Sequence, residues 1–285
     1  MATRHQPVAI VIMSQSHELQ LHIAQMREIR SILNAMKNLA LMEVHKLQRF
    51  QTMQGQVVTA IENAASDFLS FYPDLLTDNV NANNLCIVLG AERGFCGDFN
   101  DSLLAAICKE NYTGIIAIGN RLCDKLVDNK RLTTTLEGAN VAEEIPVILN
   151  HLIDILTAAK PNEAHLTIVY HDIELNQIRQ RQLFPPFASV KSATPRYGYP
   201  PVLNLEPAVF LTDLIEQYLL AVLHEVFYLS LMAENHSRLQ HLDGAIKHLD
   251  DEMINLHRKS QIYRQEEITE EIEVILLNAE SEFMR

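Results

Sequence analysis

The stretch that decides the fold is Met26–Phe50, which reads MREIRSILNAMKNLALMEVHKLQRF. Its apolar residues recur at steps of three, four or seven and are Met26, Ile29, Leu33, Met36, Ala40, Leu47 and Phe50. Glu43 is the single polar residue within this stripe. Such spacing fills the a and d positions of a coiled-coil helix.

The surrounding sequence extends this helix and repeats its pattern at the other end of the chain. From Ser14 to about Phe71 there is no proline and one glycine, Gly55, and Ser14 or Ser16 can cap the start. The far end steps by three and four through Leu239, Leu242, Ile246, Leu249, Met253 and Leu256. Pro207 marks where this second helix begins, and no proline follows it.

The length of these two helices favours pairing between the chain ends. Helices of about 55 and about 75 residues would extend about 80 and about 110 Å, too long to wrap one compact core. We therefore expect an antiparallel intramolecular coiled coil. The alternative left open is that each segment is broken into ordinary core helices.

The middle of the chain alternates short apolar runs with helical segments, which is typical of a parallel α/β sheet. Strands are expected at Leu85–Leu89, Ile115–Gly119 and Leu166–Tyr170, with Glu174–Leu183 as a hairpin partner. Helices are expected at Asp101–Glu110, Asn120–Asp128 and Glu143–Ala159. Six of the ten prolines lie in residues 184–207, which predicts a loop there. The predicted domains are a coiled-coil helix over 14–72, a Rossmann-like α/β domain over 80–206 and a coiled-coil helix over 207–285.

Composition and charge exclude several classes of protein. Only 6% of the 285 residues are aromatic and nine are glycine, which argues against an all-β fold. The net charge of −13 is opposite to that of a nucleic-acid-binding surface. Residues 1–50 carry six Lys and Arg against three Asp and Glu, whereas residues 207–285 carry six against fifteen, so paired termini would attract.

The cysteines and apolar runs indicate neither a disulfide framework nor a membrane span. The four cysteines form no CxxC pair, and a reducing setting is the simplest interpretation. No apolar run reaches the about 20 residues that cross a bilayer. Val8–Met13 is too short for a typical signal peptide, and the sequence leaves open whether it is an extension or a misassigned start.

The main candidate for chemistry is the segment 90–97, which reads GAERGFCG between a predicted strand and a predicted helix. A phosphate-binding loop would have this context, but the closing lysine and Ser/Thr are missing. We interpret its glycines as shaping a tight turn and Cys96 as structural. His241 and His248 lie two helical turns apart and His224 is not part of HExxH, so neither a metal nor a cofactor is expected. The acidic residues at 266–273 are interpreted as a solvated helix face.

Five segments, taken in order, resemble the gamma subunit of rotary F-type ATP synthases. The N-terminal helix motif of that family is similar to ILNAMKNLA at 32–40, and its loop motif is similar to AERGFCGDFN at 91–100. Residues 166–185 resemble its last sheet strands, and residues 234–245 and 264–272 resemble its C-terminal helix motifs. The resemblance covers about residues 16–280.

The resemblance implies a rotor shaft formed by both chain ends, with a Rossmann-like domain at its foot. Such a subunit is not itself an enzyme and transmits torque between a membrane ring of c subunits and the alpha and beta subunits. The implied partners also include the epsilon subunit but no nucleic acid, and the location is peripheral, at the cytoplasmic face of the energy-coupling membrane. Rotor–stator contact is expected at Met36, Arg264, Gln265 and Thr269. The foot-domain loop is expected to use Arg93, Gly94, Cys96 and Gly97.

Several departures from the family pattern keep alternatives open. The C-terminal helix is acidic, Asp98 replaces a usual glycine, Ser260 and Gln261 replace a usual Tyr-Asn pair, and about a dozen residues extend the N-terminus. The chain is therefore either a housekeeping subunit or a divergent paralogue. A coiled-coil scaffold that kept the fold without rotation, and a small α/β enzyme with helical arms, are the other interpretations.

Overall fold

The computed structural model describes residues 6–75, 83–158, 164–173, 177–187 and 197–283. Its elements in chain order are α1 (Gln6–Leu69), η1 (Pro73–Leu75), β1 (Asn83–Leu89), α2 (Phe99–Ile107), β2 (Gly114–Ile118), α3 (Asn120–Leu126), β3 (Leu132–Leu136), η2 (Ala142–Glu144), α4 (Ile145–Ala158), β4 (Ala164–Asp172), β5 (Gln177–Phe184) and α5 (Pro207–Phe283). The chain forms two compact units, one of residues 39–241 and one of residues 1–38 with 242–285. Each unit is described by itself.

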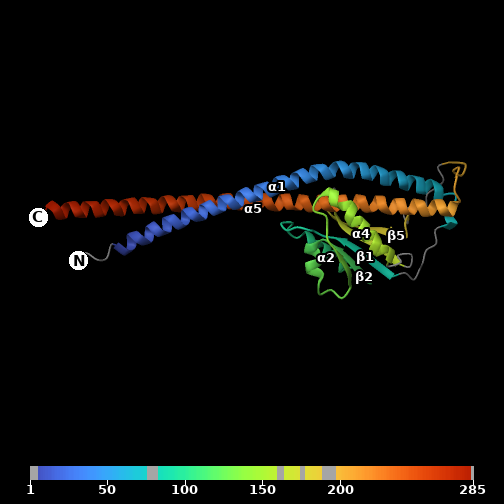
Figure 1. Ribbon diagram of the computed structural model, residues 1–285, viewed down its shortest axis with the longest axis horizontal. Helices are drawn as coiled ribbons and strands as arrows, with labels where there is room; N and C mark the ends of the chain where they lie inside the picture. Colours follow the sequence, from blue (N-terminus) through green and yellow to red (C-terminus); the bar gives the residue numbers. More distant parts are fainter. Residues whose placement is uncertain (1–5, 76–82, 159–163, 174–176, 188–196, 284–285) are drawn as a thin grey trace. The chain divides into compact units, whose positions relative to one another are not determined.

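The unit of residues 39–241 contains a single sheet with the strand order β3-β2-β1-β4-β5. Figure 1 labels β1, β2 and β5 of this sheet. The first four strands are parallel, and β5 pairs antiparallel with β4. The three strands expected from apolar runs correspond to β1, β2 and β4. The expected hairpin partner Glu174–Leu183 corresponds to β5 from Gln177 onward, and residues 174–176 lie outside the described residues. The edge strand β3 was not predicted, because its sequence LTTTL alternates half-buried and exposed residues and presents no apolar run.

Helices cover both faces of this sheet. Cys86 and Val88 of β1 pack into the cluster that contains α2 and α3, whereas Ile87 and Leu89 pack into the cluster that contains α4, α1 and α5. Successive side chains of a strand point to opposite faces, so a strand covered on both sides reads as a continuous apolar run. This double burial explains why the central strands could be found from the sequence.

The two long helices run antiparallel in this unit. Phe50 stacks on Tyr228 with ring centroids 5.6 Å apart, and Phe68 packs on Phe210 at 4.9 Å. Between these pairs, the side-chain amide of Gln54 donates to the Ala221 carbonyl at 3.0 Å. Residue numbers rise along α1 while those of their partners fall along α5, as expected for a chain whose ends pair.

The second unit shows the same antiparallel pairing, from Lys37 beside Asp243 to Arg27 beside His257. Its core cluster is Leu33, Leu242 and Ile246, against which Met36, Ala245 and Leu249 pack. Two ion pairs flank that cluster and join the helices, Arg30 to Asp250 and Lys37 to Asp243, each with an N···O distance of 2.5 Å. A few apolar contacts and two ion pairs therefore hold this part of the coil.

Three details differ from the sequence expectations. Helix α1 begins at Gln6, ahead of the predicted Ser14, because residues 8–13 continue the helix and Pro7 stands in its first turn, where proline is tolerated. Ile29 is 48% exposed and Phe50 is 38% exposed, so two members of the predicted stripe lie outside the buried seam. The predicted helix Glu143–Ala159 starts with the separate turn η2, and Ala159 lies outside the described residues.

Helix α5 is long and apolar enough to cross a bilayer by length and composition alone. Half of the residues in the most apolar stretch of α5 are buried within the structure. The core helix of a folded domain can be equally long and apolar. In this chain, α5 side chains between Leu211 and Met232 belong to the apolar core beside the sheet.

Candidate functional site

The foot-domain loop, residues 90–98, leaves the carboxyl end of β1. Strand β1 lies between β2 and β4, so the chain reverses its direction of sheet winding at this strand. In open α/β sheets, ligands bind in the crevice beside such a reversal. The loop is therefore placed where a Rossmann-like fold would bind a phosphate.

A carboxylate of the chain itself fills this position. Glu234 of α5 is 4% exposed, and its carboxylate accepts the backbone N–H groups of Glu92 and Arg93 at 3.3 Å each. Backbone N–H groups at the end of a strand are the donors that would hold a phosphate. Because Glu234 uses two of them, the loop is bound to α5.

Arg238, one helical turn from Glu234, completes the contact. Its guanidinium pairs with Glu234, donates through Nε to the Gly94 carbonyl at 3.2 Å and through Nη1 to Oδ1 of Asn235 at 2.7 Å. Ser237 adds a bond from its hydroxyl to the Cys96 carbonyl at 2.8 Å. The chain thus pairs a buried charge with an opposite charge and hydrogen bonds, as buried ions require.

Burial governs the acid–base behaviour of this cluster. Desolvation raises the pKa of Glu234, and the adjacent Arg238 and the two backbone N–H groups oppose that rise. Desolvation, with the nearby Glu234 carboxylate, raises the pKa of the Cys96 thiol to about 12. The thiolate is the nucleophilic form of cysteine, so at neutral pH Cys96 is a protonated, packed side chain.

The remaining loop residues hold the turn and its neighbours. Gly97 has a φ of +61°, and a Cβ added there would stand 1.8 Å from Nε2 of His241. Arg93 is exposed and donates through Nε to Oδ1 of Asn140 at 2.6 Å. Gly94 has open space around it, so its part in the loop is the carbonyl that Arg238 binds.

The structure separates the residues expected at the rotor–stator contact. Met36 is half-buried against the cluster of Leu33, Leu242 and Ile246. Arg264, Gln265 and Thr269 are exposed on α5, beyond that cluster. The Thr269 hydroxyl donates to the Gln265 carbonyl at 2.8 Å, within the same helix. The α5 residues therefore share a free surface, and Met36 belongs to the packing between α1 and α5.

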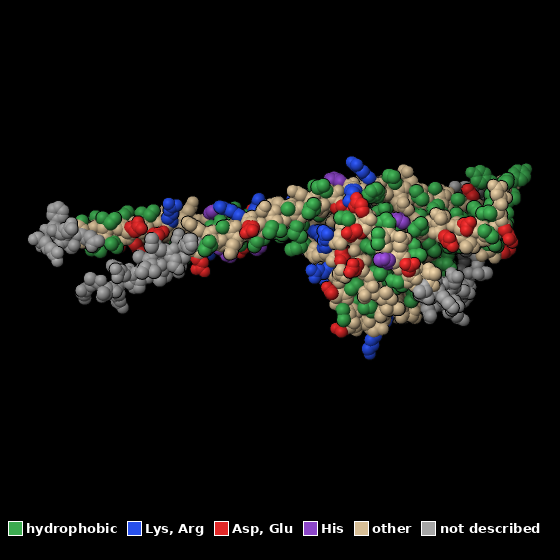
Figure 2. All heavy atoms as spheres, viewed as in Figure 1, with side chains coloured by type: hydrophobic (Ala, Val, Ile, Leu, Met, Phe, Trp, Pro, Cys, Tyr) green, Lys and Arg blue, Asp and Glu red, His purple; other side chains and the backbone are tan. Residues whose placement is uncertain are grey.

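An exposed apolar surface accompanies them that the heptad analysis missed. Between residues 254 and 277 of α5, eight large apolar side chains are at least 45% exposed: Ile254, Ile262, Ile268, Ile272, Val274, Ile275, Leu276 and Leu277. Figure 2 shows hydrophobic side chains beside acidic ones at the surface of this part of α5. The sequence contains a signal for this surface. The isoleucines at 262, 268 and 272 lie outside the heptad stripe that Leu249, Met253 and Leu256 define, so the predicted seam does not bury them. Large exposed apolar side chains gathered on one element are a candidate site of contact with another protein or a membrane.

No metal site stands out in the part of the chain that the structure describes. Among those residues, no group of three or more His, Cys, Asp or Glu side chains is placed to hold a metal ion. His241 lies against Gly97, and the ring of His224 bonds the Leu220 carbonyl of its own helix at 2.9 Å.

Comparison with known proteins identifies the family from the sequence. Residues 15–281 match the family described as ATP synthase. The "ATP synthase gamma chain" of Clostridium perfringens strain SM101 is 24% identical, over 93% of this chain and 97% of that relative. The corresponding protein of Clostridium botulinum strain Langeland is also 24% identical, over 91% and 95%.

Solved structures with a similar fold come from the same machinery. A chain of the Euglena gracilis mitochondrial ATP synthase, in a structure of OSCP, F1 and c-ring, has a TM-score of 0.63 with 14% identity, covering 94% of each chain. A chain from the rotor of that enzyme has a TM-score of 0.59 with 15% identity, covering 90% of this chain and 99% of its own length. With the family match over nearly the whole length, this chain belongs to the family of ATP synthase gamma chains.

Proposed function

We propose that this chain is the central-stalk rotor subunit of an F-type ATP synthase. It would transmit torque between the ion-driven c-ring and a head of alpha and beta subunits. The observation that carries the proposal is the antiparallel pairing of α1 with α5, with exposed isoleucines where α5 continues past the paired core. A shaft needs stiffness from the pairing and a free surface toward its surroundings, and this chain has both.

The exposed surface of α5 is proposed as the contact with the head. Arg264, Gln265 and Thr269 lie among its isoleucines, and a planar guanidinium suits a carboxylate on the opposing subunit. As this asymmetric surface turns, it would contact three chemically identical beta subunits differently, and a differential contact energy is what shifts a conformational equilibrium. Met36 is proposed to act through the packing of α1 on α5.

The α/β domain is proposed as a structural foot without catalytic activity. Glu234 occupies the backbone N–H groups that a nucleotide phosphate would need, and Cys96 is protonated at neutral pH. Arg93, Gly94, Cys96 and Gly97 would then hold the loop to α5, while the outer surface of the foot contacts the c-ring and the epsilon subunit. The proposed location is peripheral, on the cytoplasmic face of the energy-coupling membrane. The domain limits 14–72, 80–206 and 207–285 are proposed as the functional division of the chain.

The test is rotation of the assembled complex. The chain is produced with the alpha, beta and epsilon chains of its own organism, and a bead is attached through Cys108, an exposed cysteine just after α2. Replacing the half-buried Cys123 by serine directs the label to Cys108. We expect the chain to co-purify with alpha and beta and the bead to turn when ATP is added.

Two results would contradict the proposal in different ways. Failure to join alpha and beta subunits would remove the rotor function altogether. A complex that hydrolyses ATP while the bead stays still would favour the non-rotary scaffold. Deleting residues 261–285 removes most of the exposed α5 surface. When the complex is joined to its membrane sector, the deletion should lower ATP-driven ion transport more than ATP hydrolysis.

A further inference from the structure

Arg181 lies on β5, the edge strand of the sheet, and contacts both long helices. Its Nη1 donates to Oε2 of Glu225 on α5 at 2.6 Å, and its Nη2 donates to Oε1 of Glu62 on α1 at 2.8 Å. The guanidinium carbon is 6.0 Å from the ring centroid of Tyr218, whose hydroxyl donates to the same Glu62 oxygen at 3.4 Å. One side chain therefore joins three elements that are far apart in the sequence.

The geometry of this contact is specific to arginine. A guanidinium presents its N–H groups in a fixed planar fork, so it can bond two carboxylates in two directions at once. The side chains of Glu225 and Arg181 are 15% and 24% exposed, which limits the screening of the pair by water. A lysine ammonium is a compact charge on a flexible stem and would not fix both partners in one plane.

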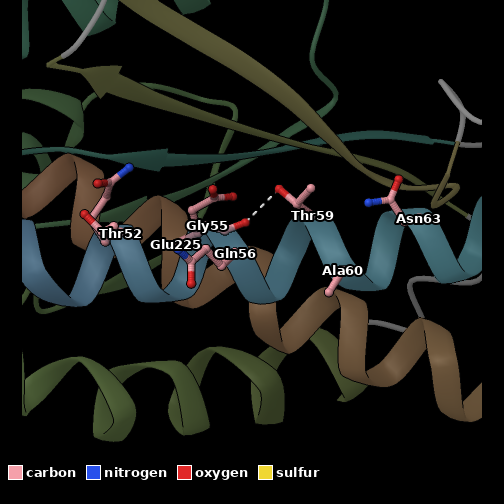
Figure 3. Close-up of a pocket in the computed structure, with 8 residues that line it drawn as sticks. Thr52, Gly55, Gln56, Thr59, Ala60, Asn63 and Glu225 are labelled. Atoms are coloured by element: carbon pink, nitrogen blue, oxygen red, sulfur yellow. Dashed lines mark hydrogen bonds between the residues drawn. The ribbon is translucent and has the colours of Figure 1, made fainter.

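The surroundings of Glu225 show why its contact depends on Arg181. Figure 3 shows the Glu225 side chain beside Gly55 of α1, and a Cβ at Gly55 would stand 3.4 Å from Oε1 of Glu225. A groove of about 650 Å³ here is lined by Gly55, Ala60, Glu225 and the neutral polar side chains Gln51, Thr52, Gln56, Thr59 and Asn63. A second groove of about 330 Å³, also lined by Glu225, contains Arg179 and Arg181, and Arg179 pairs with Asp172 of β4 at 3.0 Å. Among the residues that the structure describes, Arg181 is the cation that pairs with Glu225.

Apolar packing and ionic contacts resist motion differently. The core between the sheet and the helices is hydrophobic, and hydrophobic attraction is non-directional. Charged hydrogen bonds are short and directional, so a helix that slides or rolls on the sheet breaks them. The ionic contacts of Arg181 with Glu62 and Glu225, called here the Arg181 clasp, add directional resistance to sliding at the sheet edge. A joint that carries torque needs such resistance.

We propose that Arg181 is a positioning residue that locks the sheet to α1 and α5 at once, so that torque passes between the α/β domain and the helix pair without slip. This inference rests on the proposed rotor function. Arg181 acts through Glu62 and Glu225 and takes no part in catalysis at the beta subunits.

The experiment uses the assembled complex with the bead on Cys108, because torque must cross from the helices to the sheet domain to turn that bead. Arg181→Met removes the guanidinium and keeps an unbranched apolar side chain. With a small bead the variant should rotate at nearly the wild-type rate. With a large bead, which adds viscous load, it should stall or slip at least about tenfold more often, because loss of even one of the two charged hydrogen bonds corresponds to about that factor.

Three further variants separate the clasp from general stability. Arg179→Met changes the more exposed arginine of β5, which pairs with Asp172 of the sheet and with neither long helix, and should behave as wild type under load. Arg181→Glu with Glu225→Arg restores one opposite-charge pair and should recover part of the load tolerance. Glu225→Gln leaves Arg181 bonded to Glu62 and should reduce load tolerance less than Arg181→Met does. If Arg181→Met does not assemble, Glu225→Gln tests the clasp in its place.

The outcomes distinguish this inference from the rotor proposal. A wild-type bead that never turns removes the rotor function itself. If the wild-type bead turns and Arg181→Met and Glu225→Gln match it at every load, the clasp is overturned while the rotor function stands.

Discussion

At the scale of single residues, Glu43 shows how a polar side chain can occupy a core position of a heptad. Its carboxylate accepts the Ala142 N–H at 2.7 Å, at the start of η2, and pairs with Lys46 at 2.9 Å. Lys46 in turn reaches Glu143 at 2.7 Å. Glu43 therefore docks the turn before α4 onto α1, and its interruption of the apolar stripe marks that docking point.

Glu43→Leu would complete the apolar stripe, yet we expect it to destabilise the chain. The variant leaves the Ala142 N–H without its acceptor and deprives Lys46 of one partner, at a cost of about 1–3 kcal/mol. Urea unfolding followed by circular dichroism measures the change. Glu43→Gln keeps an acceptor oxygen and should lose less, and a leucine variant at least as stable as wild type would show that the heptad alone governs this position.

His171 gives the chain an acid-sensitive contact beside the foot-domain loop. Its ring stacks on Phe99 at 3.9 Å between centroids, and Nε2 lies 2.8 Å from the Phe99 carbonyl. Desolvation lowers the pKa of His171 below 6.5, although this hydrogen bond and the nearby Asp98 oppose the change. As the pH falls through 6.5, His171 binds a proton in the unfolded chain but stays neutral in the folded chain. The free energy of unfolding therefore decreases from about pH 6.5 downward, until His171 is also protonated in the folded chain.

We therefore expect the free energy of unfolding to fall between about pH 7 and about pH 5 by more in wild type than in His171→Gln. Glutamine does not titrate and still offers a donor to the Phe99 carbonyl. Urea midpoints across this range measure the difference between the two proteins, which cancels the shared titration of other groups. Parallel pH profiles for the two proteins would mean that His171 does not contribute.

At the scale of elements, Gly55 is the one glycine of α1, and it sits where α1 passes the Glu225 carboxylate. A Cβ there would stand 3.4 Å from Oε1 of Glu225, which is an ordinary contact distance. Alanine in a helix interior is about 0.5–1 kcal/mol more favourable than glycine. We expect Gly55→Ala to raise the free energy of unfolding by that amount, measured by urea denaturation.

A larger side chain tests the reason for this expectation. Gly55→Leu should destabilise, because it would displace the Glu225 carboxylate from Arg181. If Gly55→Ala also destabilises, the helices approach more closely at this point than the 3.4 Å distance indicates.

The elements differ in how well their structure could be predicted from the sequence. The long helices and central strands were predictable because their burial leaves a regular apolar pattern, as in Ile115–Ile118 of β2. The edge strand β3 was not predictable from the sequence, because it is a strand through backbone pairing with β2 and has no apolar run. Glu234 and Arg238 were visible as a motif, but their contact with the loop joins residues about 140 positions apart, and spacing carries no such information. The Arg181 clasp was invisible for the same reason.

At the scale of the whole molecule, everything depends on the two ends of the chain lying together. Lys37 and Asp243 are 206 residues apart, and their Nζ and Oδ1 atoms are 2.5 Å apart. A carbodiimide activates a carboxylate, which a neighbouring amine attacks to form an amide with the reagent leaving as a urea. We expect this reagent to join Lys37 to Asp243 in the intact chain, detected as a linked peptide by mass spectrometry after proteolysis.

The chain supplies its own positive control. Lys247, one turn along α5, also lies 3.2 Å from Asp243, so a link within α5 should form beside the link between helices. Lys37→Arg replaces the amine by a guanidinium, which forms no amide under these conditions, and should remove the long-range link while the Lys247 link remains. If wild type gives the Lys247 link but no Lys37 link, Asp243 is reactive and α1 is not beside it. The pairing of the ends would then fail, and the rotor proposal with it.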